Sequence, residues 1–114
     1  MASSIQTPVQ PDVQTTRWYA KNSSLGEAYQ KFADTCNEET ILDKKTKELL
    51  QLALASVFRC SHCTESHIKK AIAAGASKQE ISEALIISAQ QAAGTQLSWN
   101  RDVFEKYLGE KTGL

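Results

Sequence analysis

The chain has 114 residues, enough for one domain with its own core, and its 13 Lys and Arg balance its 13 Asp and Glu. This neutrality argues against a basic nucleic-acid groove or a polybasic membrane anchor. No apolar run approaches the roughly 20 residues that span a bilayer, and the N-terminus lacks the pattern of a secretory signal. We therefore expect a soluble cytoplasmic protein with no nucleic-acid or membrane partner.

Residues 1–22 are polar, contain both prolines and show no periodicity, so we expect an extended or disordered N-terminal arm. Trp18 and Tyr19 could attach the end of this arm to the domain or to another subunit. The remainder, residues 23–114, is expected to form one helical domain.

Helical signals follow one another along residues 23–114. The capping-box sequence "SLGE" predicts a start at Ser24, and the helix is expected to end near "NEE" at 37–39. Asp43 can cap the next helix, whose segment 49–58 is apolar nearly all round, as in a buried helix. The following helix carries the cysteines and is expected to stop at Gly75.

The C-terminal third is expected to hold two more helices. "SKQE" at 77–80 is a second capping box, and Gly94 is the expected end of the helix that it starts. Residues 96–108 supply a last helix that Gly109 closes. No segment alternates like a strand, so we predict an all-α fold, a compact bundle of about five to six helices with the cysteine pair at the start of a central helix.

The stretch "FRCSHCTESH", residues 58–67, holds both histidines and two of the three cysteines. On a helix, Cys60, Cys63 and His67 differ by about 300° and 700° of rotation, so they share one face within roughly 60°. His62 points away from Cys63 by about 100°. A cysteine near a helix N-terminus has a stabilised thiolate, which predicts reactivity.

Three interpretations of this stretch stay open on spacing alone. The two thiols can form a redox site in which one cysteine attacks and the other resolves. They can belong to a zinc site, although zinc ligands usually come from two separated pairs. They can also be inert core residues. Cys36, which has no neighbouring ligand in the sequence, is best interpreted as a small, partly buried apolar residue.

Glu48 lies in the apolar run "KELLQLALA" of the preceding helix. It could be an ordinary surface charge, because several lysines are close in sequence. With Glu48 included, "LDKKTKELLQLALA" and "CSHCTESHIKKAIAAGASKQEISEAL" resemble the core of the carboxymuconolactone decarboxylase and alkylhydroperoxidase AhpD-like family, over residues 42–94. The specific pattern is a glutamate twelve residues before a CxxC, with a histidine inside the motif and another four residues after it.

The resemblance implies a thiol-dependent hydroperoxide reductase. Cys63 would be the peroxidatic thiol, and His67 would take part in its deprotonation. Cys60 would be the resolving thiol, and Glu48 its general base in a proton relay with His62. Burial among leucines would raise the pKa of Glu48 toward the working range of a base.

The same resemblance implies further properties of the protein. The substrate would be a small hydroperoxide, the electrons would come from an external thiol or dithiol protein, and no cofactor or metal would be needed. Short members of the family assemble, so a trimer or a hexamer is expected. Because the family also contains enzymes that decarboxylate a lactone without a redox CxxC, that activity remains an alternative, as does a non-catalytic redox sensor.

Overall fold

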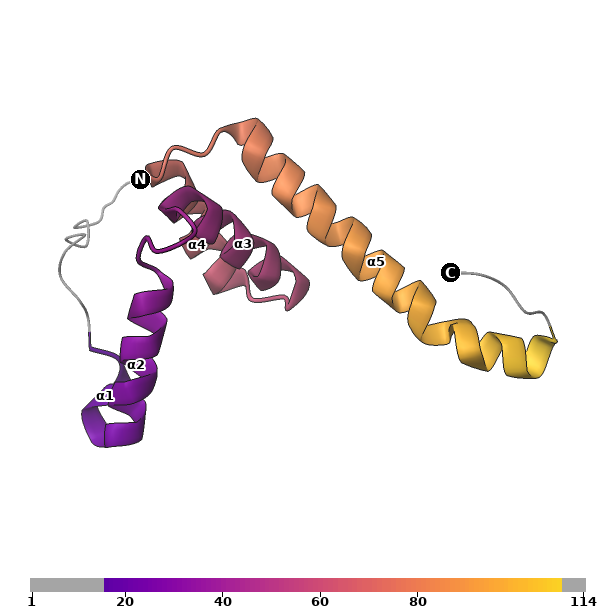
Figure 1. Cartoon of the computed structure of the whole chain (residues 1–114), viewed down its shortest axis with the longest axis horizontal. Coiled ribbons are helices and arrows are strands. Elements are labelled where there is room, and N and C mark those ends of the chain that lie inside the picture. Colours follow the sequence, from indigo (N-terminus) through magenta and orange to yellow (C-terminus); the bar gives the residue numbers. More distant parts are fainter. Residues whose placement is uncertain (1–15, 110–114) are drawn as a thin grey trace. The chain divides into compact units, whose positions relative to one another are not determined.

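The computed structural model describes residues 16–109. The described residues fall into two compact units, divided between Cys36 and Asn37. Every regular element among residues 16–109 is an α-helix (Figure 1). The all-α prediction is therefore confirmed. None of the described helices is both long enough and apolar enough to cross a membrane.

The first unit pairs a short helix, α1 (Trp18–Asn22), with α2 (Ser24–Cys36). The rings of Tyr19 and Tyr29 meet edge to face with centroids 5.3 Å apart, and Ala20 is buried. Gly26 lies against the backbone of Tyr19 so closely that an added Cβ would collide with its carbonyl oxygen. Residues 18–22 are thus helical, although the sequence predicted an extended arm there. Residues 1–15 of that arm lie outside the described part of the chain.

The start of α2 is capped one residue earlier than predicted. The hydroxyl of Ser23, and not that of Ser24, accepts the backbone N–H of Gly26 at 2.9 Å. Ser23 also accepts the N–H of Glu27 through its carbonyl. From the sequence alone, the adjacent Ser23 and Ser24 are equivalent candidates for the N-cap. In the folded chain Ser23 is the cap, and Gly26, whose N–H it accepts, is the residue that lies against the backbone of Tyr19.

The second unit contains α3 (Lys44–Val57), α4 (Ser61–Ala73) and the long α5 (Lys78–Leu108). Helix α3 packs against both α4 and α5, and its neighbour α4 lies beside it in Figure 1. Leu52 of α3 and Ala71 of α4 are completely buried, with Ala55 and Ser88 nearly so. The small residues allow the helices to approach closely, and this packing fixes α3 against the helix that carries the cysteines.

Most of the predicted helix boundaries in this unit are confirmed. Asp43 accepts the N–H of Thr46 at 2.7 Å as the N-cap of α3. Ser77 and Glu80 form a reciprocal capping box at the start of α5. Gly75 and Gly109 have φ of 94° and 78°, the left-handed geometry that favours glycine after a helix.

The predicted helix end at Gly94 is wrong, because α5 continues through it as one helix of 31 residues. A glycine ends a helix when its backbone turns left-handed, but the left-handed residues of the described chain do not include Gly94. An added Cβ there would meet only the Gln90 side chain, at 3.9 Å. Good helix formers on both sides therefore carry the helix across this position.

Helix α3 buries only one side within the single chain. Leu52 is fully buried, but Leu50, Leu54 and Val57 are between 40% and 55% exposed, and Phe58 just beyond the helix is 76% exposed. The prediction of a helix buried all round is thus not met by the isolated chain. Further apolar side chains are exposed along α5, namely Ile86, Ile87, Leu97, Trp99, Val103, Phe104, Tyr107 and Leu108.

Candidate redox site at the start of α4

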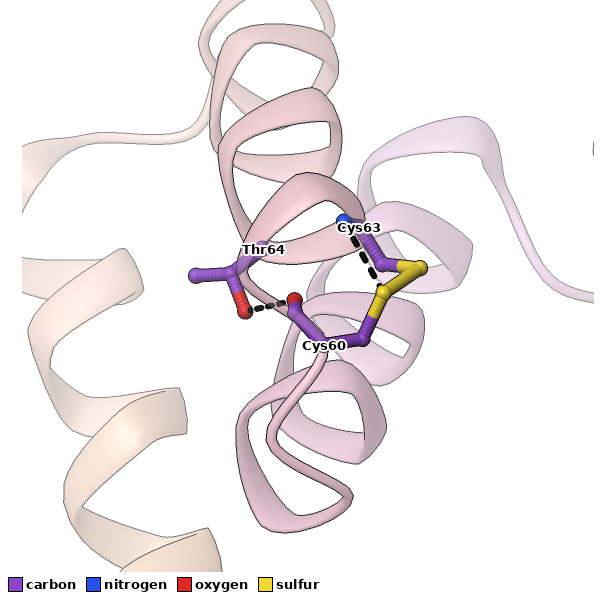
Figure 2. Close-up of a disulfide and its surroundings, with 3 residues drawn as sticks. All are labelled: Cys60, Cys63 and Thr64. Atoms are coloured by element: carbon purple, nitrogen blue, oxygen red, sulfur yellow. Dashed lines mark hydrogen bonds between the residues drawn. A yellow bond between two sulfur atoms is a disulfide. The ribbon is translucent and has the colours of Figure 1, made fainter.

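The two cysteines of the CxxC motif form a disulfide at the N-terminus of α4 (Figure 2). Cys60 is the N-cap residue, and Cys63 lies in the first turn of the helix, with 5.2 Å between their Cα atoms. Both side chains are partly exposed. The pair can therefore alternate between disulfide and dithiol at a position that a small molecule or a partner thiol could reach.

The residue before Cys60, Arg59, has a left-handed backbone conformation. Arg59 has φ of 61°, unusual for a residue with a side chain, and it follows Phe58, the C-cap of α3. Its N–H donates to the Ser56 carbonyl, and the N–H of Cys60 donates to the Ala55 carbonyl, at 3.2 and 3.0 Å. This closure costs about 1–2 kcal/mol of backbone strain at Arg59. It reverses the chain within three residues, so Cys60 starts α4 directly beside the end of α3.

The first turn of α4 points one backbone hydrogen-bond donor at the sulfur of Cys60. The backbone N–H of Cys63 donates to Sγ of Cys60 at 3.2 Å, and the hydroxyl of Thr64 donates to the Cys60 carbonyl at 2.9 Å (Figure 2). An N–H group and the positive end of the helix dipole both stabilise negative charge on a thiol. This contact favours Cys60 as the sulfur that leaves as a thiolate when an external thiol opens the disulfide.

A second cluster joins α3 to α4 through Glu48, whose side chain is completely buried. One carboxylate oxygen, Oε1, lies 2.7 Å from Nδ1 of His67, and the other, Oε2, accepts a hydrogen bond from Nζ of Lys44 at 2.7 Å. Burial raises the pKa of Glu48, but the hydrogen bonds and charges of Lys44 and His67 outweigh it, so the pKa lies below its ordinary value. The predicted upward shift is therefore wrong, because the sequence did not show these two partners.

His67 links this buried carboxylate to the face of α4 that carries Cys63. It follows Cys63 by four residues, so the two side chains lie on the same side of the helix. Its side chain is 16% exposed, and its Nδ1 is engaged by Glu48. The other ring nitrogen, Nε2, is then the one that can exchange a proton with a thiol or a substrate.

The structure arranges the predicted site residues as two pairs. Cys60 is bonded to Cys63, and Glu48 is paired with His67. His62, the relay partner of Glu48 implied by the resemblance, is exposed and belongs to neither pair. Sequence reasoning missed Lys44 as a member of the site, although its i, i+4 spacing from Glu48 was a usable signal. Among residues 16–109, no group of three or more His, Cys, Asp or Glu side chains is arranged to hold a metal ion.

The chain is similar to several proteins of known sequence or structure. "Uncharacterized protein 4 in cox locus" of Paracoccus denitrificans is 35% identical over 72 residues, which are 63% of this chain and 65% of that protein. A crystallised protein of Methanobacterium thermoautotrophicum is 26% identical with a TM-score of 0.69, over 77% of this chain and 99% of its own.

A crystallised Thermotoga maritima protein is 27% identical with a TM-score of 0.56, over 75% of this chain and 98% of its own. It is described as a carboxymuconolactone decarboxylase family protein with a suggested role in the antioxidative response. The sequence profile of the carboxymuconolactone decarboxylase family matches residues 24–106, which include every residue of the two pairs and Lys44. The chain belongs to the carboxymuconolactone decarboxylase family.

Proposed function

We propose that this chain is a thiol-dependent hydroperoxide reductase with an antioxidant role. The observation that carries the proposal is the Cys60–Cys63 disulfide at a helix N-terminus, beside a buried Glu48–His67 pair. The dithiol form of this pair supplies two electrons as it becomes the disulfide, and a histidine held by a carboxylate supplies a proton acceptor. The description of the Thermotoga maritima relative points in the same direction.

The first half of the cycle reduces the peroxide at Cys63. Nε2 of His67 takes the thiol proton, and the Cys63 thiolate attacks one oxygen of ROOH. An S–O bond forms while the O–O bond breaks, and the departing alkoxide receives the proton from His67 and leaves as ROH. Cys63 is then a sulfenic acid, oxidised by two electrons.

The second half regenerates the disulfide and then the dithiol. The sulfur of Cys60 attacks Cys63, an S–S bond forms, and the sulfenic oxygen leaves as water with the proton of the Cys60 thiol. An external thiol or dithiol then reduces the disulfide, gives up two electrons and is itself oxidised. The N–H of Cys63 favours Cys60 as the leaving thiolate in that reduction. We place this cycle in the cytoplasm, where such reductants are abundant.

Consumption of an organic hydroperoxide tests the proposal. The dithiol-reduced chain should consume cumene hydroperoxide with dihydrolipoamide as the reductant, and alkylation of the reduced cysteines with iodoacetamide should stop the reaction. A lactone decarboxylase activity that survives alkylation would contradict the proposal. So would reversible disulfide formation with no peroxide consumption, which is the behaviour of a sensor.

The exposed apolar residues of α3 and α5 support assembly into a homo-oligomer, which we propose is a trimer or a hexamer. Large contiguous apolar surface is rare on monomers. Trp99 is 83% exposed and Leu97 75% exposed, both on the C-terminal part of α5. Light scattering after size exclusion should give a mass of three or six chains, and Trp99→Glu should reduce it. Gln91→Glu, at an exposed polar position of the same helix, is the control, and a monomeric wild type would overturn this expectation.

A further inference from the structure

Lys44 contacts the buried carboxylate although the proposed cycle gives it no role. Its ammonium group donates to Oε2 of Glu48 and to the main-chain carbonyl of Asn37, each at 2.7 Å. The side chain is 39% exposed, so its stem reaches from the surface into the helix interface while its charge lies on Glu48. The carbonyl of Asn37 is a second, fixed acceptor that holds the ammonium in this position.

The two oxygens of Glu48 are divided between two partners. Lys44 occupies Oε2, and Nδ1 of His67 lies against Oε1. An ionised carboxylate only accepts hydrogen bonds. Nδ1 must therefore carry the hydrogen in this contact, and in a neutral imidazole Nε2 is then left with a free lone pair.

We propose that Lys44 is a positioning residue, which holds Glu48 as a carboxylate and thereby fixes the His67 tautomer that presents Nε2 as the proton acceptor. The use of that acceptor in peroxide reduction rests on the proposed function, whereas the tautomer does not. The assignment adds to the site a residue that touches neither the thiols nor a substrate.

Removing the charge of Lys44 should move the hydrogen of this contact from Nδ1 of His67 to the Glu48 carboxyl group. The cations facing Glu48 are Lys44 from its own helix and His67, when protonated, from α4, and no ion pair within residues 16–109 brings a charge of α5 onto it. Without Lys44, only His67 still lowers the pKa of Glu48, so burial, the largest single influence, shifts the balance toward the neutral carboxyl group. A neutral carboxyl donates its hydrogen to Nδ1, and the hydrogen of the imidazole then resides on Nε2. His67 can no longer accept a proton there.

The test is ¹⁵N NMR of the histidine side chains in the reduced 114-residue chain, at a pH where the imidazoles are neutral. The chain contains only two histidines, and the exposed His62 serves as an internal reference. In the wild type, His67 should be the Nδ1–H tautomer. Lys44→Gln should shift it toward the Nε2–H tautomer and lower hydroperoxide turnover by about tenfold or more. The acidic limb of its pH profile should also move to higher pH.

Two further variants sharpen the test. Lys44→Arg keeps the charge and should retain both the Nδ1–H tautomer and the turnover of the wild type. Lys45→Gln removes the neighbouring charge, which pairs with Glu80, and should change neither. An Nε2–H tautomer in the wild type would overturn the proposal whether or not the variants fold. Equal effects of Lys44→Gln and Lys45→Gln would overturn it as well.

The failure of the proposed function gives a different result. If the wild type showed the Nδ1–H tautomer and its Lys44 dependence but consumed no hydroperoxide, the positioning role would stand and the peroxidase assignment would fall. If the wild type consumed peroxide but the tautomer did not depend on Lys44, the peroxidase assignment would stand and the positioning role would fall.

Discussion

Replacing Cys63 with serine should lower hydroperoxide turnover by more than about 1,000-fold, because the hydroxyl that remains is a far weaker nucleophile than a thiolate. The substitution keeps the volume and the helix position of the side chain, so α4 should form as before. The measurement is steady-state consumption of cumene hydroperoxide with dihydrolipoamide, accompanied by a circular dichroism spectrum that checks the helical content.

Cys36→Ser is the matched control, since Cys36 lies in the other unit of the chain. The structure shows it as an exposed free cysteine, so the prediction of a partly buried residue is wrong. Cys36→Ser should leave turnover unchanged. Undiminished activity in Cys63→Ser would contradict the assignment of the peroxidatic thiol. Cys60→Ser separates the two roles, because one equivalent of peroxide should then leave a sulfenic acid on Cys63, detectable by mass spectrometry after trapping with dimedone.

Local signals in the sequence predicted the helix ends at which only one residue can act as the cap. Asp43 and the Ser77–Glu80 box are isolated caps in front of periodic segments, and each side chain accepts the expected N–H. Gly94 was misleading because its conformation depends on the residues around it. The short helix at 18–22 was missed because contacts between Tyr19 and α2 stabilise it, and five residues carry no periodicity that reveals it.

Helical spacing predicted that the two cysteines and His67 lie together, and the resemblance to the family added Glu48, but neither predicted how these residues pair. The i, i+3 relation of Cys60 and Cys63 predicts neighbouring thiols, which the disulfide confirms. Which histidine meets Glu48 depends on how α3 packs on α4, and that long-range packing places His67 there. The sign of the pKa shift of Glu48 could not be predicted from the sequence either. It depends on the balance between burial and two hydrogen-bonded partners, one of which is set by the same packing.

Glu48→Gln should reduce turnover by about 100-fold or more, because a neutral amide cannot stabilise the imidazolium that forms on His67. It should also lower the free energy of unfolding by about 1–3 kcal/mol, since the neutral amide loses the charge-assisted hydrogen bonds that the buried carboxylate makes with Lys44 and His67. Its NH₂ group must then face either Lys44 or Nδ1 of His67. Turnover assays and urea unfolding at neutral pH measure the two effects.

The control is Glu80→Gln, which removes an ion pair whose carboxylate side chain is 42% exposed and keeps a glutamine that can serve the capping box. An exposed pair contributes at most about 1 kcal/mol, so this variant should unfold close to the wild type. A Glu48→Gln variant as active as Glu80→Gln would contradict the role of the buried carboxylate in the proton transfers.

The stability that Glu48 contributes should also disappear in acid, and the direction follows from its pKa. Lys44 and His67 together overcome the effect of burial, so the pKa is lower in the folded chain than the 4.5 of a free glutamate. The unfolded chain therefore binds the proton more readily, and falling pH favours unfolding. The difference in unfolding free energy between wild type and Glu48→Gln should be largest above pH 4.5 and shrink as pH falls through the folded pKa. Asp43 and Glu80, whose pKa values are also lowered, are common to both proteins and cancel in this comparison. A difference that grew in acid would mean that burial prevails and that the carboxyl group is neutral beside His67.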